Sequence, residues 1–76
     1  MPRLPRLAGR EIVSALQRLG FEVARQRGSH IVMRRDNVGC VVPDHREVKV
    51  GTLAGVLKQA GVSVDEFLDA LTGKRG

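Results

Sequence analysis

The stretch FEVARQRGSHIVMRRDNVGCVVP (residues 21–43) decides the fold, because its side-chain pattern is typical of β-strands rather than of a helix. Three short runs of residues are divided by Gly28-Ser29 and by Asp36-Asn37, which are pairs typical of tight turns. The second and third runs are rich in β-branched residues, which favour strands. The stretch therefore predicts an antiparallel meander with strands at residues 21–27, 29–35 and 38–43.

Alternation along these strands separates a face turned toward the helices from the opposite face. The residues expected on the helix-facing side are Phe21, Val23, Ile31, Met33, Val38, Cys40 and Val42. The opposite face then carries His30, Val32 and Arg34. Cys40 is the single cysteine, so it cannot form an internal disulfide, and we expect it to be a buried thiol that packs as a small hydrophobic group.

The segments on either side of the meander have helical periodicity. Apolar residues between positions 10 and 19 recur at the spacing of one helical face, and Gly20 is well placed to end that helix. A second helix is expected over about 52–60, and a third after a capping box at residues 63–66. The residues expected to be buried on these two helices are Leu53, Val56, Leu57, Ala60, Phe67, Leu68 and Leu71.

The predicted order is helix, three strands and helix, with a short extra C-terminal helix. This is an α+β fold with helices on one face of a three-stranded antiparallel sheet. The double-stranded-RNA-binding domain has this order, among other domains, so topology alone does not fix the function. With 76 residues we expect a single domain over 10–72, preceded by an extended, proline-containing arm at 1–9 and followed by a frayed tail at 73–76.

The composition argues against several classes of protein. One cysteine and two scattered histidines have no metal-site spacing, so we expect neither a metal nor another cofactor. Glycine-rich phosphate loops and the nucleophile elbow of hydrolases are absent from the sequence. No apolar run approaches the ~20 residues of a membrane helix, and the N-terminus lacks the apolar stretch of a secretory signal. A cytoplasmic location is therefore expected.

The charge of the chain points to nucleic acid. The formal net charge is +5, and ten of the thirteen basic residues are arginine, whose planar fork suits bidentate contact with phosphate. A small, arginine-rich, cationic domain is an ordinary candidate for binding nucleic acid. A basic surface that docks an acidic protein partner remains the alternative at this point.

One histidine has a setting that suits chemistry on RNA. In RQRGSHIVMRR (residues 25–35), His30 follows a Gly-Ser turn and stands between two arginine clusters. RNA carries its own nucleophile, the 2′-hydroxyl, so a positioned imidazole can catalyse its cleavage by proton transfer without a metal. A lone histidine on a strand, like His45 in its loop, is more often structural or merely exposed. From the residues alone, a ribonuclease and a non-catalytic RNA-binding module both stay open.

Five short motifs stand in one order along most of the chain. They are L-x-x-x-G-F at Leu16–Phe21, R-Q-x-G-S-H at Arg25–His30, P-x-H at Pro43–His45, K-x-G-T-L at Lys49–Leu53 and Q-A-G at Gln59–Gly61. Together they resemble the HicA-type (YcfA-like) mRNA interferase toxins of prokaryotic toxin–antitoxin pairs. The similarity spans about Pro5 to Leu71.

The resemblance implies a double-stranded-RNA-binding-like fold, metal-independent cleavage of mRNA, and a cognate HicB-type antitoxin that covers the active site. It implies that His30 is the catalytic residue, acting in acid–base catalysis of attack by the 2′-hydroxyl, and that Gly28 and Ser29 form the turn that presents it. His45 matches a recurrent family position and is a candidate second proton-transfer group, with a structural role in its loop as the alternative. The residues expected to bind RNA phosphates are Arg25, Arg27, Arg34, Arg35 and Lys49.

Overall fold

The computed structural model describes residues 4–73 and has the expected order of elements. The elements are α1 (Gly9–Arg18), β1 (Glu22–Arg27), β2 (His30–Arg35), β3 (Val38–Pro43), α2 (Val50–Ala60) and α3 (Val64–Leu71). The strands form one antiparallel sheet in the order β1-β2-β3. The predicted α+β fold is thus confirmed, including the additional helix after the α-β-β-β-α order. Residues 1–3 of the predicted arm and 74–76 of the predicted tail lie outside the described residues.

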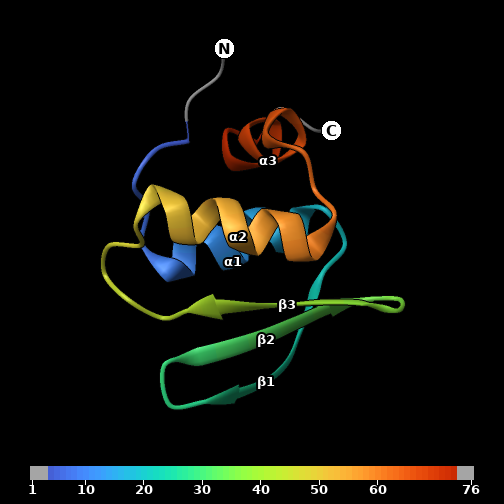
Figure 1. The fold of residues 1–76 in the computed structure, drawn as a ribbon. Coiled ribbons are helices and arrows are strands. Elements are labelled where there is room, and N and C mark those ends of the chain that lie inside the picture. The colour runs from blue at the N-terminus through green and yellow to red at the C-terminus, as the bar shows by residue number, and fades with distance from the viewer. Residues whose placement is uncertain (1–3, 74–76) are drawn as a thin grey trace.

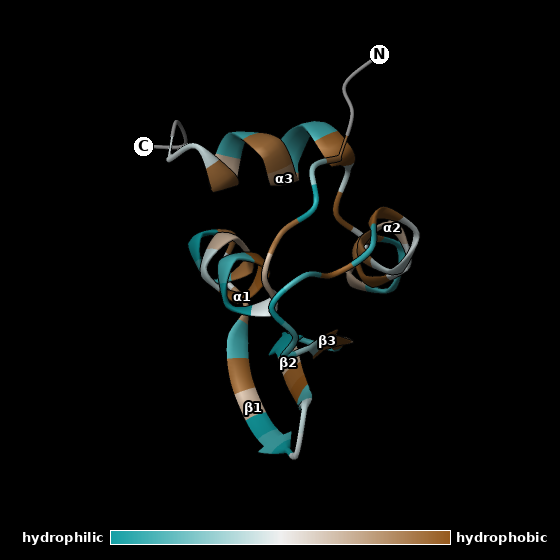
Figure 2. Ribbon diagram, turned by 90° about the vertical axis from the view of Figure 1, so that its left-hand side faces the viewer, coloured by the Kyte–Doolittle hydropathy of each residue, from teal (hydrophilic) through white to brown (hydrophobic). Residues whose placement is uncertain are grey.

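The elements are arranged in three layers. Figure 1 shows α1 and α2 above one face of the sheet, with α3 on the side of these helices that is away from the sheet. The view turned by 90° confirms this arrangement and shows α1 and α2 side by side (Figure 2). Within residues 4–73, no helix covers the opposite face of the sheet. Among the same residues, no helix is long and apolar enough to cross a membrane.

The core lies between the sheet and the helices α1 and α2 and continues between these helices and α3, and most of its side chains are aliphatic. Its largest fully buried side chains are Phe21, Phe67, Ile12, Leu16, Ile31, Met33, Leu53, Val42 and Val48. The predicted inward residues of α2 are all buried. On α3, Phe67 is buried together with Ala70, whereas Leu68 and Leu71 are partly buried and pack against the core.

Two residues expected on the helix-facing side of the sheet do not enter the core. Val23 is 43% exposed and Val38 is 37% exposed. Val23 lies on the edge strand β1, all six residues of which are exposed, and a bulge between Val23 and Arg25 interrupts the pairing there. Val38 begins β3 directly after the turn. The alternation along the strands predicted which residues share a face of the sheet. It did not predict how much of that face the helices cover.

The segment between β3 and α2 is more ordered than the predicted loop. Val48 is buried, and its N–H donates a hydrogen bond to the carbonyl oxygen of Leu7 at 2.7 Å in an isolated β-bridge. α2 begins at Val50, two residues before the expected start. The segment predicted as an N-terminal arm therefore supplies a core residue, Leu7, just before α1 begins.

Specific contacts define the helix ends. Gly20 has a φ of +95° just after α1, in the left-handed region that favours glycine. The predicted capping box is confirmed, because Glu66 N–H donates to Ser63 Oγ and Ser63 N–H donates to Glu66 Oε1, both at 3.1 Å. At the other end of α3, Arg18 Nη1 donates to the carbonyl oxygen of Ala70 at 2.7 Å, which ties α1 to the last turn of α3.

The single thiol is enclosed, as predicted. Cys40 is 3% exposed, and burial raises the pKa of its thiol above the ordinary value. The folded chain holds the thiol proton more tightly than the unfolded chain, so protonation of Cys40 favours the folded state. This contribution to the free energy of unfolding is fully present below the unfolded pKa. It is lost as the pH rises through the folded pKa.

We expect the native protein to react with a thiol–disulfide exchange reagent roughly 100-fold more slowly than the protein unfolded in urea, because access to Cys40 requires opening of the core. The measurement is the absorbance of the released aromatic thiol at a mildly alkaline pH. Cys40 is the only cysteine, so the signal belongs to one site. Equal rates for the native and unfolded protein would contradict its enclosure.

Candidate functional site

The turn between β1 and β2 places His30 at the first position of the central strand. Gly28 adopts a φ of +54° in this turn, a conformation that glycine adopts without strain. A Cβ at Gly28 would meet no atom within 4 Å, so the requirement for glycine here is conformational rather than steric. His30 is exposed and pairs with Arg27 on β1 and with Pro43 on β3.

The sheet register brings three of the four arginines of the strands, together with His30, to one face. Directly paired residues of neighbouring strands point to the same side of a sheet. Arg27, His30 and Pro43 form one row, and Arg25, Val32 and Val41 form the next; in the third row Arg34 lies opposite Glu22 and Gly39. Residues 31 and 33, which alternate with these on β2, are buried under the helices. The face that carries the three rows is therefore the uncovered one, and we call it the outer face.

The structure brings together three of the five arginine and lysine residues expected to bind phosphate. Arg25, Arg27 and Arg34 are exposed on the outer face with His30. Arg35 is engaged elsewhere: its Nη1 donates to the carbonyl oxygen of Leu19 at 2.7 Å, and its guanidinium lies 4.6 Å from the centre of the Phe21 ring. Arg35 thus fastens the end of α1 to the sheet.

The remaining candidates meet at a shallow depression beside the end of β3. This depression has a volume of about 270 Å³ and is lined by Pro43, His45, Glu47, Val48, Lys49 and Thr52. Lys49 is the exposed residue just before α2, and His45 is exposed in the loop after β3. Pro43 borders the depression and also pairs with His30, so the depression adjoins the end of the outer face at which His30 lies.

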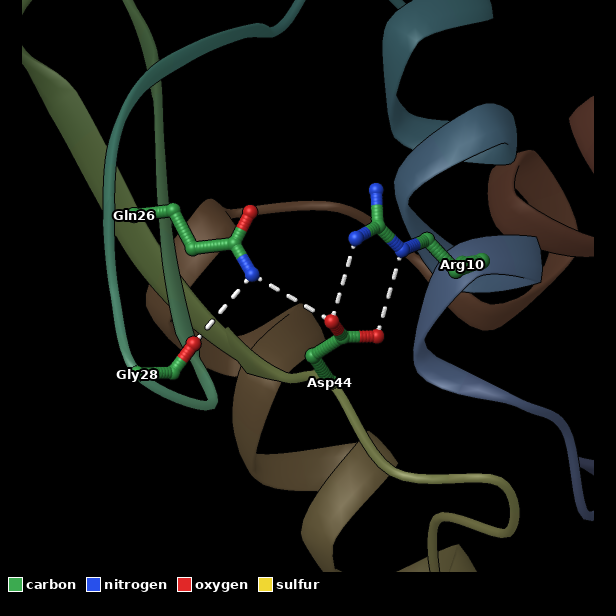
Figure 3. A network of polar contacts seen from close by, with 4 residues as sticks. All are labelled: Arg10, Gln26, Gly28 and Asp44. Atoms are coloured by element: carbon green, nitrogen blue, oxygen red, sulfur yellow. Dashed lines mark hydrogen bonds and ion pairs between the residues drawn. The ribbon is translucent and has the colours of Figure 1, made fainter.

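A network that sequence reasoning missed supports the turn before His30. Figure 3 shows the side chain of Asp44, just after β3, between Arg10 of α1 and Gln26 of β1. Arg10 and Asp44 form a bidentate ion pair, and Gln26 Nε2 donates both to Asp44 Oδ2 and to the carbonyl oxygen of Gly28. The three side chains come from distant parts of the sequence, so no local motif signals their meeting.

The chemistry available at the outer face is proton transfer and charge stabilisation. His30 supplies an exposed imidazole, and the neighbouring guanidinium groups supply fixed positive charge. Within residues 4–73, no three His, Cys, Asp or Glu side chains gather into a group that could hold a metal ion. An anionic ligand carrying its own nucleophile is the kind of substrate that suits such a site.

Comparison with known proteins identifies the family. No curated protein matches the chain. Residues 9–62 match the family described as the HicA toxin of bacterial toxin-antitoxin, and the match runs from the first residue of α1 through the sheet and α2. The matched region contains the Gly28-Ser29 turn, His30 and the outer face. The chain therefore belongs to the HicA toxin family.

Proposed function

We propose that this toxin is a metal-independent endoribonuclease that cleaves mRNA and uses His30 in acid–base catalysis. Membership of the family gives the chain its role as a toxin, with a cognate antitoxin as partner. The observation that carries the proposal is the position of an exposed histidine among three exposed arginines on the uncovered face of the sheet. This face offers proton transfer and positive charge at one place.

The proposed reaction uses the nucleophile of RNA itself. The 2′-hydroxyl oxygen attacks the adjacent phosphorus while His30 accepts its proton as general base, and the bond from phosphorus to the 5′-oxygen breaks as that oxygen is protonated. The proton that the 5′-oxygen receives comes from the protonated imidazole, so His30 returns to its neutral form when the leaving group departs. The arginines stabilise the negative charge that develops on the phosphorane. The products are a 2′,3′-cyclic phosphate and a 5′-hydroxyl.

RNA binding in this proposal depends on phosphate contacts. Arg25 and Arg27 are two residues apart on one strand, a separation of ~7 Å, and Arg34 adds a third cation on the next strand. Neither of the two phenylalanines lies in the rows of the outer face, so base stacking is not expected to drive affinity. We expect a HicB-type antitoxin to inhibit the toxin by covering this face. Because the proposed substrate is mRNA, we expect the toxin to act in the cytoplasm.

The test is incubation of the purified chain with a defined single-stranded RNA in the presence of a chelator. We expect cleavage that leaves 2′,3′-cyclic phosphate ends, and no cleavage at a position where the nucleotide is replaced by its 2′-deoxy form. Cleavage that the chelator abolishes would argue against the proposed chemistry. The order of elements resembles that of double-stranded-RNA-binding domains, and tight binding to duplex RNA with single strands left uncut would favour the second candidate, a non-catalytic RNA-binding module.

We expect the affinity for single-stranded RNA to fall steeply with salt. The log–log slope should be about −0.7 per phosphate contacted, and Arg27→Gln should make it less steep by about 0.7. Arg6→Gln is the matched control, because Arg6 pairs with Glu47 at 3.6 Å and does not belong to the outer face. Binding of a catalytically inactive variant, measured by fluorescence anisotropy across a salt series, gives the slopes. A slope that is unchanged in Arg27→Gln would show that this residue does not contact the RNA.

A further inference from the structure

The residue after β3 holds the turn that presents His30. Its backbone acts directly, because Asp44 N–H donates to the carbonyl oxygen of Ser29 at 2.7 Å. Its side chain acts through Gln26, whose amide nitrogen donates to Asp44 Oδ2 and to the carbonyl oxygen of Gly28, each at 3.2 Å. Both carbonyl groups of the two-residue turn are therefore fixed by contacts that involve Asp44 or its partner.

Asp44 is in turn fixed to the helical layer. Arg10 Nε donates to Asp44 Oδ1 at 3.2 Å and Arg10 Nη2 donates to Oδ2 at 3.1 Å, the paired geometry seen in Figure 3. The Asp44 side chain is only 25% exposed, so this ion pair is partly shielded from water. The Gly9 N–H also donates to the carbonyl oxygen of His45 at 2.8 Å, which holds the same loop against the start of α1.

We propose that Asp44 is a positioning residue, which acts through Gln26 and the Gly28-Ser29 turn to hold the imidazole of His30 in its reactive orientation. This inference rests on the proposed ribonuclease function. The turn itself is exposed, and its residues contribute no side chain to the core. Its order therefore depends on polar contacts, and a displacement of about 1 Å of a catalytic group can lower a rate by roughly 10²-fold.

The substitution Asp44→Asn should release the turn with little change in size. The Asp44 carboxylate only accepts hydrogen bonds here, from Arg10 on both oxygens and from Gln26 on one of them. An asparagine amide has one acceptor oxygen and one donor nitrogen. In either orientation its NH₂ group faces a donor, so the network cannot be satisfied by rotating the side chain.

We expect Asp44→Asn to lower kcat for RNA cleavage about 10- to 100-fold and to leave KM unchanged, because the arginines that bind RNA remain on the outer face. Glu47→Gln is the matched control. It removes the same charge from the same loop, but it breaks only the Arg6–Glu47 pair, which is exposed and has no contact with the turn. Any change caused by the lost negative charge alone would appear in both variants.

A second variant protects the test against misfolding of the first. Gln26→Met keeps the length of an exposed side chain on β1 but removes the amide that donates to Asp44 and Gly28. We expect a fall in kcat in the same direction. In nuclear magnetic resonance relaxation measurements, the backbone amides of Ser29 and His30 should become more mobile in Asp44→Asn and Gln26→Met, but not in Glu47→Gln.

The outcomes separate the two proposals. A wild-type protein that leaves RNA uncut would contradict the proposed ribonuclease function. The mobilities of the backbone amides would still show whether Asp44 orders the turn. An active wild-type protein together with folded Asp44→Asn and Gln26→Met variants that keep the native kcat would overturn only the positioning role. A loss confined to KM would also overturn it, because it would place Asp44 in RNA binding instead.

Discussion

Under the proposed function, replacing His30 with alanine is expected to abolish detectable RNA cleavage and to leave the fold intact. Loss of proton transfer is expected to lower the cleavage rate by roughly 10²–10⁴-fold, because the variant has no imidazole to accept the proton of the 2′-hydroxyl. His30 is exposed at the start of β2, so the free energy of unfolding should change by no more than about 0.5 kcal/mol. Single-turnover cleavage of a defined RNA measures the first effect, and urea unfolding followed by circular dichroism measures the second.

His45→Ala is the matched control, since it removes the other histidine of the chain, which is also exposed. If His45 only shapes its loop, the cleavage rate stays within about twofold of the native one. If it is a second proton-transfer group, its removal lowers the rate and eliminates one limb of the pH–rate profile. A His30→Ala protein that still cleaves at the native rate would rule out the proposed mechanism, whatever His45 does.

A methyl group at Gly9 is expected to destabilise the protein by about 2–3 kcal/mol. The added Cβ of Gly9→Ala would lie 2.0 Å from the carbonyl oxygen of Pro43 and 3.0 Å from the Cα of Asp44. These are backbone atoms, so the clash cannot be relieved by rotating a side chain, and α1 must move away from the loop after β3. A midpoint of thermal unfolding lowered by roughly 10–20 °C would follow for a chain of this size.

Gly55→Ala makes the same chemical change as Gly9→Ala, but we expect it to have the opposite effect on the stability of the protein. Gly55 lies inside α2, and a Cβ there would meet no atom within 4 Å. The substitution should stabilise the protein by about 0.5–1 kcal/mol, because alanine loses less backbone freedom than glycine on forming a helix. Both changes are read from urea unfolding curves. Equal stabilities for the two variants would contradict the close approach of α1 to Pro43.

Most of the fold is predictable because its signals are local. The two tight turns, the alternation along β2 and the capping box at Ser63 each depend on residues close in sequence, and each is confirmed. The exposure of Val23 and the burial of Val48 were missed, because they depend on which parts of the sheet the helices cover and on a bridge to Leu7.

Part of the candidate site was likewise predictable from the sequence, and part of it was not. His30 and its turn are predictable, because a Gly-Ser step before a histidine and the strand period together place the side chain at an exposed position on the outer face. The contacts of Asp44 and Arg35 were not predictable. Their partners lie on other elements, 34 residues away for the Arg10–Asp44 contact and 16 residues away for the Arg35–Leu19 contact. A sequence pattern within one segment does not predict contacts between residues that are so far apart in the sequence.

The apolar core and the outer face share almost no side chains, and this separation has a consequence for how the toxin can change over generations. Under the proposed function, substitutions of outer-face residues would silence the toxin while the molecule keeps its shape. Because the antitoxin is proposed to cover this same face, a silenced chain that keeps its outer-face arginines, such as His30→Ala, would continue to occupy the antitoxin. It would thereby raise the amount of free active toxin in a cell that makes both forms.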